Sequence, residues 1–250
     1  MEINWRIRIV ILLIITLISY GAVSVLAKDK ANEVFSDPNV AALVVAASRG
    51  NVKEIDRLID SGVNVNARGQ GGMTPLAYVL DQENIEGVAR LLHHGADPNL
   101  VYNEQQDSTM RRFVVRKDPT YLELALDYGG DVNALMYGKD GKPVIFDAIT
   151  LGRIANVKLL INAGADVNRQ DSFSGETPLH ATGYSRKYEI AYILLEAGAD
   201  PRINDKAGKN GLLRAIEKTQ RPGSEEIYQW RQKVIEYLRA AGMEIDPKYP

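Results

Sequence analysis

The sequence predicts an all-α solenoid of about six helix–turn–helix repeats with short β-turn tips. A glycine closes each predicted repeat, and the copies are Gly62, Gly95, Gly129, Gly164, Gly198 and, more weakly, Gly242. The first four steps between these glycines are 33, 34, 35 and 34 residues, and the last is 44. The segments before the glycines are amphipathic at helical spacing, so each repeat has an apolar face for its neighbours. The spacing therefore indicates a stack that buries one continuous core.

The closing glycines have a backbone reason. Each follows a predicted helix, where a left-handed residue lets the chain turn and satisfies the last helical carbonyls. An Asp or Asn follows soon after, as in Gly164-Ala165-Asp166-Val167-Asn168, and such side chains bond local amides. We therefore interpret these glycines as scaffold and not as a phosphate-binding loop.

The inner helices open on a recurring phrase. Thr74-Pro75-Leu76 and Thr177-Pro178-Leu179-His180-Ala181 place proline in the first helical turn, where its missing N–H costs nothing. The second phrase and the later Leu194-Leu195-Glu196-Ala197-Gly198-Ala199-Asp200 together resemble the ankyrin repeat, and this resemblance recurs along almost the whole chain. It implies that Leu76 and Leu179 point into the stack and that His180 bonds neighbouring turns.

Other repeats match less well. Shifted openings occur at residues 142–148 and 210–215, and the corresponding segment of the first repeat is residues 43–50. The third repeat, at residues 108–115, lacks both the proline and the small residues that let inner helices pack closely. Outer helices are expected around residues 52–59, 88–92, 121–126, 157–161 and 190–195.

These signals divide the chain into a leader at residues 28–36 and a repeat domain at residues 37–246. The repeats are expected at residues 37–66, 67–99, 100–133, 134–168, 169–202 and 203–246. The last carries an insertion at residues 218–224 and a longer final helix. A terminal repeat needs a polar outer face, and Glu226, Arg231, Lys233 and Glu236 are expected to supply it.

Residues 1–27 have the anatomy of a secretory signal peptide. Arg6 and Arg8 precede an apolar run, and Val25-Leu26-Ala27 fits a signal-peptidase site before Lys28. The alternative is an uncleaved anchor, because the uncharged run at residues 9–27 is barely long enough to span a membrane. Either way we expect the repeats in the periplasm, free or anchored to the inner membrane.

The composition argues against catalysis. The 250 residues include no cysteine and three histidines, and the formal net charge is −2. Nothing in this balance indicates a nucleic-acid partner. His93 and His94 are adjacent and face apart on a helix, so we do not expect a two-histidine metal site. We expect instead histidines at a helix end, where the helix dipole favours them. No nucleophile elbow, zinc-protease motif or phosphate loop occurs, and we expect no enzyme, cofactor or metal.

The family resemblance implies that a protein partner binds the concave face, formed by turn tips and exposed inner-helix residues. By register, the tips contribute Gln70, Met73, Glu104, Gln105, Lys139, Asp140, Phe173, Glu176, Lys206 and Lys209. The inner helices contribute Arg49, Asp81, Gln82, Arg116, Thr150, Tyr184 and Ser185. Their mixed charges suit a protein better than a polyanion.

Two places stand out within this set. Phe173 and Tyr184 belong to one repeat and could form an aromatic anchor, since aromatic residues are enriched in hot spots. The connection from Leu100 to Asp107 is longer than its neighbours and carries Tyr102. Met136 and Tyr137 are similar in kind. The alternative is that all of them are ordinary exposed loop residues.

The basic cluster of Arg111, Arg112, Arg116 and Lys117 is expected to be a solvated face, with contact to an acidic partner as the alternative.

The function expected is therefore that of a monomeric, periplasmic, non-enzymatic protein that binds one protein partner. Exported bacterial ankyrin proteins include immunity proteins against periplasm-acting toxins and companions of oxidative-stress enzymes, and both stay open. A membrane-anchored structural scaffold and a host-directed effector are further alternatives.

Overall fold

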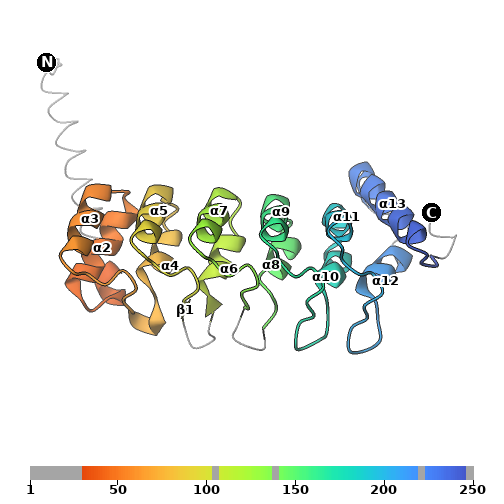
Figure 1. The fold of residues 1–250 in the computed structure, drawn as a ribbon, viewed down its shortest axis with the longest axis horizontal. Helices are drawn as coiled ribbons and strands as arrows, with labels where there is room; N and C mark the ends of the chain where they lie inside the picture. The colour runs from red at the N-terminus through yellow and green to blue at the C-terminus, as the bar shows by residue number, and fades with distance from the viewer. Residues whose placement is uncertain (1–29, 103–106, 137–140, 219–222, 246–250) are drawn as a thin grey trace, which may run out of the picture. The chain divides into compact units, whose positions relative to one another are not determined.

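The computed structural model describes residues 30–102, 107–136, 141–218 and 223–245. The chain divides into two compact units, unit 1 (Met1–Ala96) and unit 2 (Asp97–Pro250), each built from helical pairs (Figure 1). The proposed signal peptide, residues 103–106 of the connection from Leu100 to Asp107, and Tyr137, Lys139 and Asp140 lie outside the described residues. Within the described ranges, no helix is both long and apolar enough to cross a membrane.

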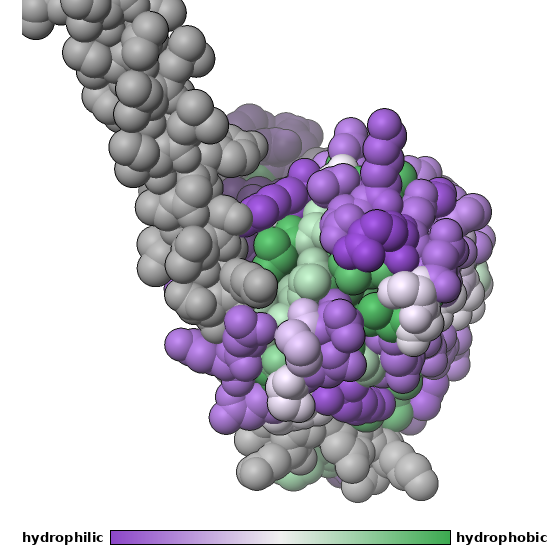
Figure 2. All heavy atoms as spheres, turned by 90° about the vertical axis from the view of Figure 1, so that its left-hand side faces the viewer, coloured by the Kyte–Doolittle hydropathy of each residue, from purple (hydrophilic) through white to green (hydrophobic). Residues whose placement is uncertain are grey.

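Unit 1 contains two helical pairs and one short 3-10 turn. Its elements are α2 (Pro38–Ser48), α3 (Val52–Asp60), η1 (Gln70–Gly72), α4 (Pro75–Leu80) and α5 (Ile85–His93). The inner helices α2 and α4 pack on each other, and so do the outer helices α3 and α5. Figure 2 looks onto the end of this unit, where polar side chains form most of the surface and apolar ones show between them.

The residues before the first repeat do more than lead into it. Residues 30–34 are helical, and Ala31 and Phe35 are buried. The ring of Phe35 meets that of Tyr78 edge-on, with centroids 5.8 Å apart. The expected polar leader therefore contributes to the core of unit 1.

The adjacent histidines of unit 1 differ from the expectation in one respect. His93 ends α5 and His94 caps it, and the His94 ring lies 2.8 Å from Asp56 on α3. Arg90 also donates to Asp56, at 2.5 Å. These hydrogen bonds, Arg90's first, lower the pKa of Asp56 to about 2. His94 therefore ties two outer helices together in addition to ending its own.

Unit 2 begins with a two-stranded hairpin and continues as four helical pairs. The hairpin pairs β1 (Val101–Tyr102) with β2 (Asp107–Ser108) in antiparallel register. The inner helices are α6 (Thr109–Val114), α8 (Ile145–Thr150), α10 (Pro178–Ser185) and α12 (Gly211–Lys218). The outer helices are α7 (Thr120–Asp127), α9 (Ile154–Asn162), α11 (Tyr188–Glu196) and α13 (Glu225–Ala240). Successive inner helices contact one another, and so do successive outer helices.

The repeat frame forms as the sequence predicts. The backbone is left-handed at each strongly matched closing glycine, with φ of 95° at Gly62, 84° at Gly95, 82° at Gly129, 91° at Gly164 and 89° at Gly198. Leu76 and Leu179 are buried, as are the residues in the same place of weaker repeats, Met110, Ile145 and Leu212.

His180 has the role that the resemblance implies. Its Nδ1 accepts the backbone N–H of Thr177 at 3.1 Å, which completes a capping box at the start of α10. Its Nε2 lies 3.2 Å from the carbonyl of Lys209 at the next turn.

One polar contact was not predicted and links the repeats in series. In unit 2, Asn168 donates through Nδ2 to the carbonyl of Gly198 at 3.1 Å and accepts the N–H of Asp200 at 2.7 Å. Asn99 makes the same pair of bonds to Gly129 and Asp131. The second polar residue of each Gly-Ala-Asp-x-Asn phrase therefore joins one repeat to the next.

The final helix covers the end of unit 2 differently from the expectation. Val234, Ile235 and Leu238 are buried, and Lys233 and Glu236 are exposed as predicted. Arg231 is buried instead, and its Nη2 donates to the carbonyl of Ile216 at the end of α12 at 2.9 Å. A cation near a helix C-terminus satisfies carbonyls that have no partner in the helix, which explains its inward position.

Candidate partner-binding site

The tip between α9 and α10 is organised by one carboxylate. The side chain of Asp171 is fully buried, and its Oδ1 accepts the N–H groups of Phe173 at 2.9 Å and Ser174 at 2.7 Å. Its Oδ2 accepts the Ser174 hydroxyl at 2.5 Å and the N–H of Glu176 at 3.0 Å. The backbone of Asp171 also bonds the carbonyl of Glu176 at 2.8 Å. The carbonyl of Asp171 accepts the N–H of Gly175 at 3.0 Å, so six hydrogen bonds of one residue fix the path of this tip.

Phe173 stands at the top of this fixed turn. Its side chain is 87% exposed, the largest exposure among the exposed large apolar residues of the described chain. The next tip holds the same turn from the other side, because Lys206 donates through Nζ to Ser172 O at 2.5 Å and through its backbone to Ser174 O at 2.9 Å. A large apolar ring is thus presented to solvent on a rigid support.

The charge state of Asp171 follows from these contacts. Burial alone would raise the pKa of Asp171, but the bonds from Ser174, the charge of Lys142 and the N–H of Phe173 together lower it below its usual value. The carboxylate is therefore ionised at neutral pH.

Beside this tip, a hollow of about 300 Å³ lies over helices α8 and α10. Its apolar lining comes from Met136, Phe146, Ala181 and the ring of Tyr184. Its polar lining comes from Lys142, Asp147, Thr150, Glu176 and Ser185. Met136 and Phe146 are buried and form the floor, whereas Tyr184 is 55% exposed and stands at the rim.

Two cations border the hollow, and each lies close to two carboxylates. Lys142 donates to Glu176 at 2.9 Å, lies 3.9 Å from Asp171, and sits 5.3 Å from the centre of the Phe146 ring. On the other side, Arg111 of α6 donates to Asp147 of α8 at 2.5 Å and to Asp107 at 3.3 Å. The Lys142–Glu176 and Arg111–Asp147 pairs each join neighbouring repeats, so they hold the walls of the hollow in place.

Two of the hydroxyl groups around the hollow, those of Thr150 and Ser185, donate their protons to their own helices. Thr150 donates to Phe146 O at 2.8 Å, and Ser185 donates to Ala181 O at 2.7 Å, both within their own helices. Burial, together with the negative charges of Glu176 and Asp205, raises the pKa of Tyr184. The hydroxyl oxygens are left with lone pairs, which accept hydrogen bonds.

The structure brings together four of the residues that the sequence predicted as partner-binding. Thr150, Glu176, Tyr184 and Ser185 line the hollow, and Phe173 stands on the tip that Glu176 ends. Lys206 and Lys209 are exposed on the following tip. In unit 1, Arg49, Gln70, Asp81 and Gln82 are exposed, and Met73 is half-buried. Glu104, Gln105, Lys139 and Asp140 lie outside the described residues.

Two sequence expectations about exposure, one in the third repeat and one in the fourth, are wrong. Tyr102 is 4% exposed, because Arg112 lies over its ring at 4.6 Å and bonds its hydroxyl, which in turn donates to Asp107 at 3.1 Å. Met136 is 5% exposed and contributes only to the floor of the hollow. Neither offers its side chain as a projecting anchor.

The basic cluster is not a solvated face either. Arg111 and Arg112 are half-buried in the contacts just described. Arg116 is also half-buried, with its guanidinium 5.7 Å from the centre of the Tyr121 ring. Of the four residues, Lys117 alone is exposed as expected.

Sequence reasoning missed Lys142, Phe146 and Asp147 as lining residues. All three lie in the shifted opening phrase of the fourth repeat, whose residues are predicted to build the repeat and not to line a binding surface. The phrase is apolar except for two charged residues, Lys142 and Asp147, and these charges were the signal that part of it lines a surface. Within the described ranges, no group of three or more His, Cys, Asp or Glu residues is placed to hold a metal ion.

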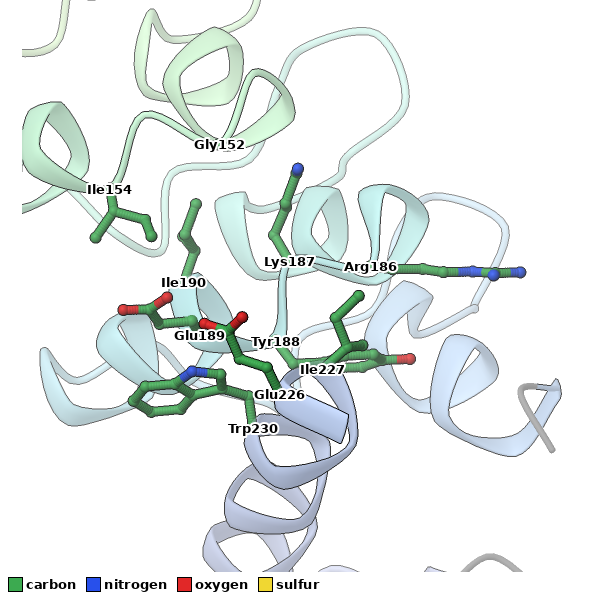
Figure 3. Close-up of a pocket in the computed structure, with 10 residues that line it drawn as sticks. All are labelled: Gly152, Ile154, Arg186, Lys187, Tyr188, Glu189, Ile190, Glu226, Ile227 and Trp230. Carbon is green, nitrogen blue, oxygen red and sulfur yellow. The ribbon is translucent and has the colours of Figure 1, made fainter. Parts of the chain in front are cut away.

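A second hollow of about 210 Å³ lies near the starts of the outer helices α11 and α13 (Figure 3). Ile154, Ile190, Ile227 and Trp230 supply its apolar lining. In Figure 3 the carboxylates of Glu189 and Glu226 lie near each other above the Trp230 ring, and the Lys187 ammonium points away, toward Gly152. None of the residues predicted as partner-binding lines this hollow.

Comparison with known proteins agrees with this architecture. The family model for ankyrin repeats in three copies matches residues 13–102 and 145–248, well over half of the chain. The ankyrin repeat protein YahD from Escherichia coli (strain K12) is 29% identical over 198 residues, which cover 76% of this chain and 93% of that protein. The mitochondrial disaggregase of Bos taurus is 32% identical over 163 residues, 62% of this chain but 22% of that protein.

Among solved structures, the crystal structure of the ankyrin repeat domain of Bcl-3, a member of the IkappaB family, aligns with a TM-score of 0.67. The alignment covers 78% of this chain and 85% of that one at 22% sequence identity, which supports the fold alone. On the family match, the helical pairs and the left-handed closing glycines, this chain belongs to the ankyrin-repeat family, whose repeats mediate protein–protein interactions.

Proposed function

We propose that this chain is a non-enzymatic, exported protein that binds one protein partner through the tips and inner helices of unit 2. The observation that carries the proposal is Phe173, a phenyl ring 87% exposed on a turn held by Asp171. Leaving such a ring in water forgoes roughly 1.5–3 kcal/mol of burial free energy, which a partner recovers by covering it.

The rigid support adds to this argument. Binding loses affinity when loops must be ordered, and a preorganised tip avoids that loss. The hollow beside the tip adds a concave, mostly apolar surface with a few polar groups, which is the usual form of a recognition site. Tyr184, 55% exposed at the rim, supplies a second aromatic contact.

A photo-crosslinking amino acid placed at position 173 tests this proposal in the native cell. We expect a discrete crosslinked species with one protein. The matched control places the same amino acid at Lys158, which is exposed on the outer helix α9. Equal crosslinking at both positions, or none at 173, would contradict the proposal.

The identity of the crosslinked protein decides between the narrower roles. A toxin that acts in the periplasm would make the chain an immunity protein, and an oxidative-stress enzyme would make it an accessory of that enzyme. Crosslinking to components of the envelope would favour a structural scaffold.

Export is the second part of the proposal and rests on residues 1–27. The basic start, apolar run and small residues before Lys28 support cleavage after Ala27. The mass of the protein purified from the native cell should correspond to a chain that begins at Lys28. A mass that includes Met1, with the protein in the membrane fraction, would show an anchored protein instead.

A further inference from the structure

We propose that the hollow over α8 and α10 receives the side chain of an arginine or a lysine from the partner. This inference rests on the proposed function, because it names the chemistry of the group that enters the same site. It follows from three features of the hollow: its hydrogen-bonding groups, its charge and its apolar walls.

The hydrogen-bonding groups of the hollow are mainly acceptors. The protons of Thr150 and Ser185 are both donated to carbonyls of their own helices, which leaves lone pairs on the hydroxyl oxygens. Asp147 and Glu176 are carboxylates, and each has more lone pairs than its recorded bonds use. Among the nine lining residues, Lys142 alone has a side chain that donates without accepting, and it is engaged by Glu176 and Asp171. An occupant rich in N–H donors therefore fits, whereas a carboxylate or a carbonyl would meet acceptors.

The charges around the hollow point the same way. The nine residues that line the hollow include one cation, Lys142, and two carboxylates, Asp147 and Glu176, so the lining itself has one negative charge in excess. From outside the lining, Arg111 is shared between Asp147 and a second carboxylate, Asp107, and therefore does not cancel this excess. A cationic side chain balances this excess, and charge-assisted hydrogen bonds are the stronger kind.

The walls suit the rest of such a side chain. Arginine and lysine bury their methylene stems along apolar surface while the charged head reaches polar groups. Met136 and Phe146 form an apolar floor, and the exposed ring of Tyr184 offers its face to a cation. Phe173 on the adjacent tip then contacts an apolar residue of the partner. The recognised segment of the partner therefore combines an arginine or lysine with a nearby apolar residue.

Selection from a displayed library of random peptides against the mature chain, residues 28–250, tests the inference. We expect the enriched peptides to carry an arginine or lysine at one fixed position, next to an aromatic or aliphatic residue. Replacing that basic residue with norleucine, which keeps the stem and removes the charge, should weaken binding about tenfold or more.

A substitution in the hollow provides the reciprocal test. Thr150→Lys adds an ammonium at an exposed position on the rim and should weaken the same peptide about tenfold or more. The control, Glu226→Gln, changes the net charge by the same amount at the second hollow and should leave affinity within about twofold. Circular dichroism melting of both variants shows that each is folded.

The outcomes separate the two proposals. Peptides that bind in a Phe173-dependent way but have no fixed basic residue, or that are unaffected by Thr150→Lys, overturn this inference and leave the proposed function standing. If the library yields no peptide that depends on Phe173, this inference falls, and crosslinking at position 173 decides the proposed function separately.

Discussion

The guanidinium of Arg202 donates to the carbonyl of Ala241 at 2.6 Å, across the junction between the last two repeats. Arg202 occupies the place in its phrase that Asn168 holds one repeat earlier, where the shorter amide reaches Gly198. The last repeat is lengthened by ten residues relative to the one before it, since its closing glycine comes after 44 residues and not 34. The longer side chain thus preserves the inter-repeat contact where the spacing changes.

The first prediction concerns this contact. Arg202→Ala should lower the free energy of unfolding by roughly 1–2 kcal/mol, because a charge-assisted hydrogen bond at the junction is lost. Urea unfolding followed by circular dichroism measures the change. Arg169→Ala is the matched control, since no hydrogen bond or ion pair of the Arg169 side chain occurs among the described residues. Equal effects of the two substitutions would contradict a specific role of Arg202.

The second prediction concerns the close approach of α10 to α12. A Cβ at Gly183 would lie 2.5 Å from the carbonyl oxygen of Gly211 and 2.8 Å from the Cα of Leu212. Gly183→Ala should therefore destabilise unit 2 by about 1–3 kcal/mol through overpacking, despite the better helix propensity of alanine. The melting temperature checks this, and an unchanged or higher value would show that the inner helices can move apart freely.

The third prediction concerns pH and Asp171. Its folded-state pKa lies below the usual value, so its contribution to stability is complete above the unfolded pKa of about 3.9 and is lost as pH falls through the folded pKa. Asp171→Asn should cost about 1–3 kcal/mol at pH 7, because the amide replaces one acceptor oxygen with a donor. The difference between the two proteins should shrink toward pH 3 in urea unfolding.

The control for this prediction is Asp127→Asn, on the exposed end of α7. Its effect on the unfolding free energy should be small, within about 0.5 kcal/mol. A cost of Asp171→Asn that stays constant from pH 7 to pH 3 would show that the carboxylate charge does not hold the tip.

The frame of the molecule could be predicted from sequence because its determinants are local. A left-handed glycine after a helix and a proline in a first helical turn need no distant partner to be recognised, and Gly198 and Pro178 show this. The amphipathic spacing then placed the outer helices correctly.

The site was only partly predictable because its side chains depend on partners far away in the sequence. Tyr102 and Arg231 are residue types expected at a surface, yet both are buried. Tyr102 packs under the Arg112 guanidinium, and Arg231 bonds a carbonyl at the end of α12. Asp147 is positioned by Arg111, which lies 36 residues earlier. Phe173, for whose side chain the described residues show no such partner, is exposed as the register indicates, and Tyr184 is partly exposed.

The central claim is that Phe173 and Tyr184 bind the partner, and the affinity of the crosslinked protein for the Phe173→Ala/Tyr184→Ala variant tests it most directly. Titration calorimetry should show binding weakened by about thirtyfold or more, the effect of losing hot-spot aromatic residues, with little change in melting temperature. The control variant, Tyr128→Ala/Tyr228→Ala, removes two exposed aromatic residues elsewhere and should bind like the wild type. Unchanged affinity of the Phe173→Ala/Tyr184→Ala variant, or an equal loss in the control, would contradict the account.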